Sequence, residues 1–273
     1  MLVDNYGRKI EYIRVSVIDR CNLSCFYCMP NRNYKKIPKE EILLLEEIAE
    51  VVKVASSLGI VKVRLTGGEP LLRRNLEYLI SQISKMEKIK EVGLTTNGIL
   101  LKKLAKKLKE AGLNRINVSL DTLDPSLFKQ ITGGGDLNTV LEGIEFAKKI
   151  GFDSIKINCI LLPFVPDEER EKIREYCFKN NIELQFIRYM NIQGRKEELG
   201  KNISLAHRPP KCSICNKIRL SVDGKLYPCL FSNKAVVIKE ERSIKEAILK
   251  AVNFKESEGG QEFPHQSMAS IGG

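Results

Sequence analysis

The sequence lacks tryptophan entirely and contains only two histidines in 273 residues. Chemistry that depends on a cluster of histidines is therefore nearly excluded. No stretch approaches the roughly eighteen consecutive apolar residues of a membrane-spanning helix. The first residues, Met1 to Asp4, show no basic segment followed by an apolar one, so we expect no signal peptide. These absences predict a cytoplasmic protein without a membrane partner.

The composition is that of an ordinary globular protein. Apolar residues make up 43% and charged residues 29% of the chain, which excludes a disordered or collagen-like protein. The length allows one large α/β domain, or one domain with a smaller appendage. Two features stand out: a net charge of +11, from 45 Lys and Arg against 34 Asp and Glu, and eight cysteines. In a reduced compartment, clustered cysteines indicate metal or redox chemistry rather than disulfides.

The first two thirds of the chain alternate between β-branched runs and amphipathic stretches. This alternation predicts a parallel sheet, and the number of strands favours a partial or complete barrel. The predicted strands are Tyr12–Val17, Val61–Thr66, Glu91–Thr95, Arg115–Leu120, Ser154–Leu161 and Glu183–Arg188. The predicted helices are Lys39–Leu58, Arg74–Lys88, Leu101–Ala111, Thr139–Ile150 and Asp167–Asn180.

The alternation ends at Met190, so we divide the chain into a barrel domain, 1–190, and a small C-terminal unit, 191–273. The second part contains a hairpin through Asp223 and Gly224 and a helix near Ser243–Val252, and we expect it to pack on the barrel mouth. In parallel barrels the chemistry lies at the carboxyl ends of the strands. The conspicuous loops 18–33, 67–70, 96–98 and 121–122 all follow strands, and we expect them to form one active rim.

The first cysteine group, Cys21, Cys25 and Cys28, has the spacing CxxxCxxC. Three thiolates from one loop can hold an iron–sulfur cube and leave one iron without a protein ligand. Such an open position is where a metal site does chemistry. A structural zinc site is the alternative, but zinc needs four protein ligands and no fourth Cys or His lies nearby.

The second cysteine group consists of Cys212, Cys215 and Cys229, and the hairpin brings Cys229 back toward the CxxC pair. It again offers three thiolates. A second cluster with an open iron and a Cys3His zinc site completed by His207 both fit this inventory. The two remaining cysteines, Cys159 and Cys177, are expected to be packing residues.

CNLSCFYC at 21–28, with TGGEP at 66–70 after the second strand, resembles the radical S-adenosylmethionine (SAM) superfamily. The resemblance implies a partial (β/α)6 TIM-type barrel. It also implies a [4Fe–4S] cluster whose open iron is chelated by SAM, which is cleaved to methionine and a 5′-deoxyadenosyl radical. Gly67 and Gly68 suit a close approach of the backbone to a ligand, and they suit a tight turn equally well.

Within that superfamily, the chain is similar to the GTP 3′,8-cyclases of molybdenum cofactor biosynthesis, which are lyases. The spacing of the second cysteine group carries this similarity, together with segments along nearly the whole chain. These segments are RVSVIDRC at 14–21, RLTGGEPLLRR at 64–74, TTNG at 95–98, NVSLD at 117–121, ITG at 131–133, KIN at 156–158, DGKLYPCLF at 223–231 and MASIGG at 268–273.

The similarity implies a role for each matching residue. The first cysteine group would hold the SAM cluster, and the second would hold an auxiliary [4Fe–4S] cluster whose open iron meets the guanine of GTP. SAM contacts would come from Tyr27, Gly68, Ser119 and Met190. GTP contacts would come from Arg14, Arg64, Thr95, Lys156, Lys217, Ile218 and Arg219. Hydrogen abstraction at ribose C3′ and attack on guanine C8 would form a cyclic nucleotide that leads to a pterin.

Elementary chemistry agrees with a triphosphate substrate. Arg and Lys suit phosphate oxygens, and no P-loop motif is present, which disfavours ordinary GTP hydrolysis. The chain departs from the family pattern at Lys217 and Gln185, which replace arginines, and at Arg188, which replaces a glutamate. The segment 191–211 is also shorter than the family's. The family's C-terminal tail lies near the active site, and we expect Gly272 and Gly273 to insert there.

Two other functions are weighed against the cyclase. One is a radical SAM enzyme with an auxiliary cluster that acts on a peptide or another small molecule. The other is a zinc-stabilised basic protein that binds RNA, but no RNA-binding motif is present and the basic stretch Lys102–Lys109 contains no aromatic residue. We therefore predict no nucleic-acid partner. Many family members work with a second protein that processes the product. The residues identify neither that partner nor the electron donor, and they do not distinguish a monomer from a homodimer.

Overall fold

A computed structural model of the chain describes residues 1–28, 36–189, 212–258 and 269–271. Its strands are β1 (Tyr12–Ser16), β2 (Lys62–Thr66), β3 (Glu91–Thr96), β4 (Arg115–Ser119), β5 (Ser154–Leu161), β6 (Glu183–Arg188), β7 (Lys217–Leu220), β8 (Lys225–Tyr227) and β9 (Val236–Val237). Its longer helices are α1 (Leu45–Leu58), α2 (Leu76–Ser84), α3 (Leu101–Glu110), α4 (Pro125–Thr132), α5 (Leu137–Lys149), α6 (Asp167–Lys179) and α7 (Ile244–Asn253).

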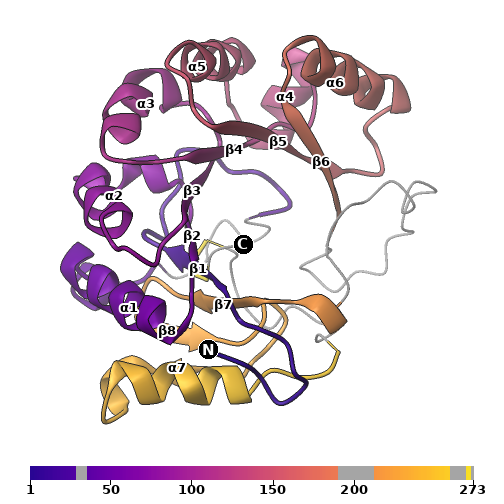
Figure 1. The fold of residues 1–273 in the computed structure, drawn as a ribbon. Coiled ribbons are helices and arrows are strands. Elements are labelled where there is room, and N and C mark those ends of the chain that lie inside the picture. Colours follow the sequence, from indigo (N-terminus) through magenta and orange to yellow (C-terminus); the bar gives the residue numbers. More distant parts are fainter. Residues whose placement is uncertain (29–35, 190–211, 259–268, 272–273) are drawn as a thin grey trace.

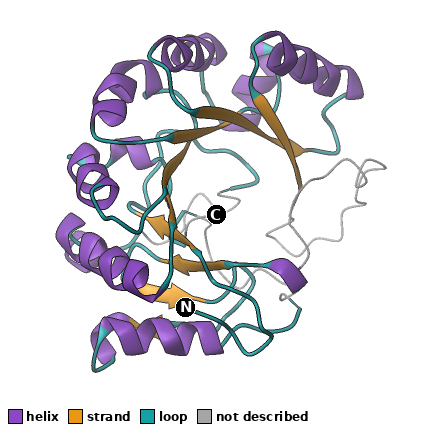
Figure 2. Ribbon diagram, in the orientation of Figure 1, coloured by secondary structure: helices purple, strands orange, loops and turns teal. Residues whose placement is uncertain are grey.

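The strands form one sheet in the order β6-β5-β4-β3-β2-β1-β7-β8-β9. Strands β1 to β6 are parallel and adjacent in chain order, which confirms the predicted partial barrel. They curve around a central space and the helices lie outside them (Figures 1 and 2). The C-terminal part adds β7, parallel to β1, and then β8 and β9, which run antiparallel.

This arrangement corrects the expected position of the C-terminal part. Strand β7 pairs with β1, so β7, β8 and β9 continue the sheet beyond β1 rather than capping the barrel mouth. The predicted hairpin is confirmed as β7 and β8. The predicted C-terminal helix is confirmed as α7, whose first turn is capped by the Ser243 hydroxyl, which accepts from the Glu246 N–H. Helix α7 packs beside α1 on the outer face of the sheet.

Alternation along the strands separates an apolar outer face from a polar inner face. On β5, Ile155, Ile157 and Cys159 are buried toward the helices, while Lys156 and Asn158 face the barrel interior. The core therefore lies between sheet and helices, and the interior is left to charged and polar side chains. Cys159 and Cys177 are both buried in this core, as predicted for packing residues.

The largest local difference from the predicted elements is helix α4, which the helical pattern did not reveal because it is only eight residues long. Asp124 caps it by accepting from the Leu127 N–H, and Pro125 stands at its first position. Its last residues offer carbonyls to the first cysteine loop: Ser24 N–H donates to Thr132 O at 2.9 Å and Phe26 N–H to Ile131 O at 3.3 Å. The predicted helix from Lys39 begins only at Leu45, and the helix predicted from Arg74 begins at Leu76.

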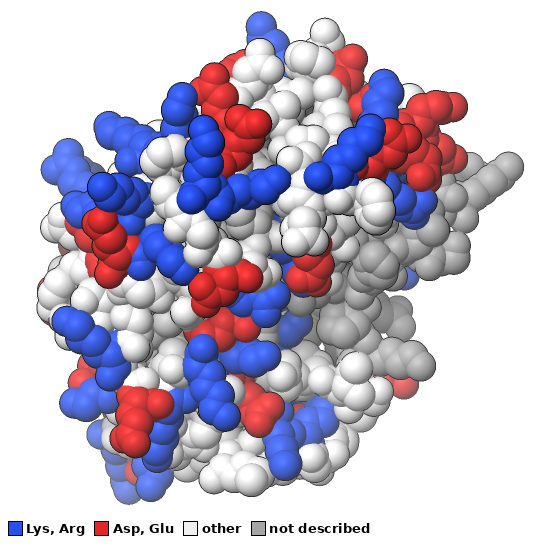
Figure 3. Space-filling view, turned by 45° about the horizontal axis from the view of Figure 1, so that its top comes forward, with Lys and Arg blue, Asp and Glu red and all other residues white. Residues whose placement is uncertain are grey.

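Basic residues are spread over the face of the molecule seen in Figure 3. Lys and Arg side chains are interspersed with Asp and Glu on the face seen in Figure 3. Lysines of α3 pair with acids on neighbouring elements, as Lys102 does with Glu142 at 3.0 Å and Lys109 with Asp153 at 2.9 Å. This pattern is that of a solvated helix face. Among the described residues, no helix is both long and apolar enough to span a membrane.

Candidate active site

The first cysteine group lies in the loop after β1, at the carboxyl end of the sheet. Cys21, Cys25 and Cys28 are free thiols of intermediate exposure. Burial raises the pKa of Cys28 to about 12, with the neighbouring Cys21 adding to the effect. Three thiolates this close to one another therefore need a compensating cation. Cys21 Sγ also accepts from the Leu23 N–H at 3.4 Å and from Asn97 Nδ2 at 3.7 Å, contacts that suit a thiolate.

Two buried carboxylates, in the loops after β2 and β4, support this end of the sheet. Glu69 is 1% exposed and accepts from Thr96 Oγ1 at 2.7 Å and Asn97 N at 2.8 Å, while burial raises its pKa to about 7. Asp121 accepts from the Tyr27 hydroxyl at 2.7 Å, and burial raises its pKa to about 6. Tyr27, a predicted SAM contact, is thereby fixed in orientation beside the cysteines.

Gly67 and Gly68 follow β2 and pack against the backbone of the cysteine loop. A Cβ at Gly68 would lie 2.2 Å from Arg20 O, and one at Gly67 would lie 2.3 Å from Ile18 O. Gly68 N–H donates to Ile18 O at 2.7 Å. Both glycines are therefore required by the contact between the two loops. The sequence pattern predicted only a tight turn or a close approach to a ligand.

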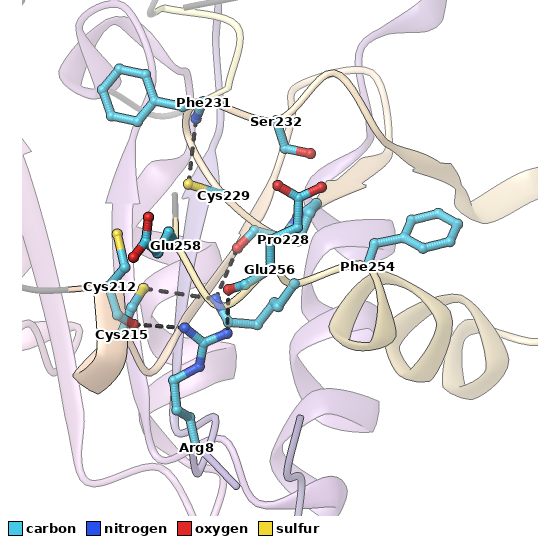
Figure 4. Close-up of a pocket in the computed structure, with 11 residues that line it drawn as sticks. Arg8, Cys212, Cys215, Pro228, Cys229, Phe231, Ser232, Phe254, Glu256 and Glu258 are labelled. Carbon is cyan, nitrogen blue, oxygen red and sulfur yellow. Dashed lines mark hydrogen bonds between the residues drawn. The ribbon is translucent and has the colours of Figure 1, made fainter. Parts of the chain in front are cut away.

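The second cysteine group lies at the opposite end of the sheet. Cys212 and Cys215 immediately precede β7, which runs parallel to β1, and Cys229 follows β8, which runs antiparallel. All three line one pocket, together with Arg8 and the segment after α7 (Figure 4). Since β1 has five residues, the two cysteine groups are separated by roughly 16 Å along the strand.

Two buried cations that sequence reasoning missed stand beside the second group. Lys255, which follows α7, directs Nζ toward Cys215 Sγ at 3.7 Å. Burial opposes ionisation of Cys215, but the charge of Lys255 and other contacts outweigh it, so the pKa of this thiol is lowered. Arg8 donates to the Cys212 carbonyl at 2.7 Å and pairs with Asp4 at 2.6 Å. Only the burial of these cations distinguishes them from surface charges, and a sequence does not show it.

Three predicted GTP contacts form a row across the sheet. Arg14 on β1 is the register partner of Arg64 on β2 and of Arg219 on β7, so the three arginines stand side by side on the inner face. Neighbouring strands are about 4.8 Å apart, and like charges opposite one another are unfavourable. Arg64 is offset in part by Glu91, with which it pairs at 3.2 Å. Burial, reinforced by the charge of Arg14, lowers the pKa of Arg219 to about 9.

The other predicted contacts flank this row. Lys156 faces the interior and pairs with Glu183, and Thr95 has a buried hydroxyl without a partner among the described residues. Lys217 faces the interior, whereas the Ile218 side chain is fully buried in the core, so a contact of Ile218 with a ligand must involve its backbone. Ser119 ends β4 on the inner face. Met190, His207, the segment 191–211 and the pair Gly272 and Gly273 lie outside the described residues.

Known proteins resemble this chain over most of its length. The model of the radical SAM superfamily matches residues 15–177. The chain is 38% identical to the GTP 3′,8-cyclase of Thermodesulfovibrio yellowstonii, over 99% of both chains. It is 39% identical to that of Clostridium botulinum strain Hall, over 92% of this chain and 91% of the other.

The chain belongs to the GTP 3′,8-cyclase family of radical SAM enzymes.

Solved structures share the family's barrel at lower sequence identity. SuiB of Streptococcus suis bound to S-adenosylmethionine aligns with a TM-score of 0.70 and 17% identity, over 86% of this chain and 65% of the other. The structure of anSMEcpe with bound AdoMet aligns with a TM-score of 0.65 and 18% identity, over 91% and 81%. At these identities the likeness establishes the radical SAM fold alone.

The chain is short for a GTP 3′,8-cyclase. The alignment with the Thermodesulfovibrio enzyme runs over 321 positions against 273 residues here, so at least 48 positions of that alignment have no residue in this chain. The shortening expected at 191–211 stays a prediction, because those residues lie outside the described ranges. Of the two departures on β6, Gln185 pairs in register with Asn158 and faces the interior, and its Oε1 has no partner among the described residues. Arg188 alternates with it and lies on the opposite face.

The donor sets fit the iron–sulfur and SAM chemistry of the superfamily. Each cysteine group offers three thiols, with N–H donors directed at Cys21 and Cys229, the latter from Phe231 N at 3.5 Å. In the described ranges, no three His, Cys, Asp or Glu side chains are arranged to hold a single metal ion. A [4Fe–4S] cube that takes one thiolate on each of three irons leaves the fourth iron open, and the three thiols of each group match this ligand number.

Proposed function

We propose that this chain cyclises GTP between ribose C3′ and guanine C8, the step that leads to the pterin of molybdenum cofactor, with GTP bound between the two cysteine groups. The arginine row carries this proposal. Arg14, Arg64 and Arg219 stand midway between the ends of the sheet, where they concentrate positive charge on the inner face. A triphosphate is an anion large enough to meet all three, and guanidinium groups bind phosphate oxygens in pairs.

At the carboxyl end, Cys21, Cys25 and Cys28 would hold a [4Fe–4S] cluster, and Tyr27, Gly68, Ser119 and Met190 would contact SAM. When bound, this pair supplies the 5′-deoxyadenosyl radical that removes a hydrogen atom from the substrate. The chain's own residues fix the geometry of that end. Asp121 holds Tyr27 through its hydroxyl, and Glu69 holds the turn after β3 through Thr96 and Asn97.

At the opposite end, Cys212, Cys215 and Cys229 would hold a second [4Fe–4S] cluster that meets the guanine. The residues from 191 onward would then be the unit that carries this cluster, and 1–190 the unit that carries SAM. Lys156, Lys217 and Thr95 would complete the phosphate and ribose contacts, with Ile218 contributing backbone. Lys217 offers a point charge rather than the bidentate fork of arginine, so Arg14 and Arg219 carry more of the triphosphate here.

The test uses anaerobically prepared full-length protein. About eight iron and eight sulfide per chain are expected for two cubes. Incubation with a reductant, SAM and GTP should give 5′-deoxyadenosine and a GTP-derived cyclic nucleotide in equal amounts. Arg14→Ala should abolish the nucleotide product, whereas Lys102→Ala, which removes an exposed lysine of α3, should leave it unchanged.

Deoxyadenosine formed at the same rate with and without GTP, and no nucleotide product, would contradict the proposed substrate. That result would favour a radical SAM enzyme acting on a peptide or another small molecule. Zinc in place of iron would contradict the radical chemistry altogether.

A further inference from the structure

Lys255 is a buried ammonium group in an environment without a carboxylate partner. The residue is 5% exposed, and no Asp or Glu in the described part of the chain forms an ion pair with it. Glu256, the next residue, pairs with Lys234 instead, at 2.8 Å. A buried charge is costly unless it is paired or fully hydrogen-bonded. The groups that accept from Lys255 therefore have to account for its burial.

The three protons of the ammonium group have three acceptors. Lys255 Nζ lies 2.9 Å from Lys217 O, 3.0 Å from Pro228 O and 3.7 Å from Cys215 Sγ. The two carbonyls are neutral, so the sulfur is the contact that can supply negative charge. A neutral thiol is a weak acceptor, whereas a thiolate bound to a cluster is both an acceptor and an anion.

Arg8 holds the segment that carries Lys255 against the cysteines. Its guanidinium donates to Cys212 O at 2.7 Å, to Glu256 O at 2.7 Å and to Ser257 O at 3.3 Å. Asp4 fixes the same guanidinium from the N-terminal segment. Figure 4 shows Arg8 below the Cys212 and Cys215 thiols, with Cys229 on the far side of the pocket. The N-terminus, the CxxC turn and the end of α7 are thus tied together at the second cysteine group.

We propose that Lys255 is a positioning residue for the second cluster, donating a hydrogen bond to the Cys215 sulfur and placing a fixed positive charge beside the cluster. This inference depends on the proposed second cluster. A nearby cation and an N–H···S bond both stabilise the more negative, reduced form of an iron–sulfur cluster, so they raise its reduction potential. Lys255 would thereby keep the second cluster easier to reduce than its three thiolates alone would make it.

The experiment compares three variants in full-length protein. Lys255→Met removes the charge and the donor with little change in volume, and Lys255→Arg keeps both. Lys234→Met is the matched control, because it removes a lysine charge from an exposed position of the same C-terminal part. Each is made with Cys21, Cys25 and Cys28 changed to serine, so that a single cluster contributes to the signal. Iron content is measured first, and the potential is then measured by a redox titration followed by electron paramagnetic resonance.

Lys255→Met is expected to lower the reduction potential of the second cluster by at least about 59 mV, which is a tenfold change in the equilibrium constant of a one-electron couple. Lys255→Arg should recover most of that shift, and Lys234→Met should not move the potential. If Lys255→Met keeps about four iron atoms per chain and an unchanged potential, the proposed role of Lys255 is wrong, whereas the proposed second cluster is supported. If the protein with the three serines and an unchanged Lys255 binds no iron, the proposal of a second cluster is wrong, and the inference about Lys255 fails with it. Loss of iron from Lys255→Met but not from Lys255→Arg would support the inference.

Discussion

A single methyl group added at Gly93 should weaken GTP binding although Gly93 is not itself a predicted GTP contact. Gly93 lies on β3 beside Arg64, and a Cβ there would come within 2.6 Å of Arg64 Cζ and 2.8 Å of its Nε. Real Cβ atoms do not approach this closely, so one of the two groups must move. The guanidinium is the far end of a flexible side chain, whereas the strand backbone is fixed by its ladder. We therefore expect Gly93→Ala to displace the Arg64 guanidinium.

The magnitude follows from the proposed phosphate contact that a displaced Arg64 would lose. Its guanidinium is held by Glu91 at 3.2 Å and by Tyr12 at 3.3 Å, and it is 7% exposed. A hydrogen bond to a charged group contributes about 1.5–3 kcal/mol. Since each 1.4 kcal/mol is about tenfold in affinity, Gly93→Ala should raise the Kd for GTP by about ten- to a hundredfold. The Kd is measured by anaerobic titration calorimetry.

A double-mutant cycle shows whether the effect passes through Arg64. If it does, Gly93→Ala should add almost nothing to the loss already caused by Arg64→Ala. SAM affinity and iron content serve as controls and should be unchanged in all three variants. An unchanged Kd in Gly93→Ala, or losses that add fully in the double variant, would refute the reasoning.

Three further predictions concern the two cysteine groups and their supports. Gly68→Ala should lower the free energy of unfolding by about 1–3 kcal/mol and weaken SAM binding, because its Cβ would meet the fixed carbonyl of Arg20 at 2.2 Å. Calorimetry measures the stability and a SAM titration measures the affinity. An unchanged melting temperature would contradict the contact. Tyr27→Phe should cost about 1 kcal/mol of stability through the lost bond to Asp121, measured by thermal unfolding, and Tyr27→Phe should cost nothing further once Asp121 is alanine. Iron content should fall from about eight to about four per chain when alanine replaces the cysteines of the second group, Cys212, Cys215 and Cys229, and it should stay at eight in Cys159→Ala, whose thiol is buried in the core.

The sequence predicts the barrel well because its signals are local. Strand β5 and strand β6 have the predicted bounds, since apolar residues alternate with polar ones along both. The long helices are similarly marked by their apolar spacing. Helix α4 was missed because eight residues provide barely two turns of pattern, and its cap at Asp124 was the signal that could have revealed it.

The position of the C-terminal part was not predictable from local signals. Whether β7 pairs with β1 or caps the barrel depends on contacts between residues about 200 positions apart, such as Asn216 O with the Tyr12 N–H. The same reason explains why Arg8 and Lys255 were missed, since each acquires its role through partners distant in sequence. The cysteine groups could be found because spacing alone identifies them. The register of Arg14, Arg64 and Arg219 became visible only when the strands were aligned.

The placement of the cysteine groups at opposite ends of β1 gives the site a fixed length. A strand backbone neither stretches nor shortens, so the distance between the two cysteine groups is fixed. That distance limits which substrates can reach both groups at once. Guanosine, which lacks the phosphates, would reach both ends but forgo the arginines between them. A free triphosphate would meet the arginines and reach neither end. Selectivity in such a site follows from span as much as from any single contact, because only a molecule that joins a base and a ribose to a chain of anionic groups engages both ends of the site and the arginines between them.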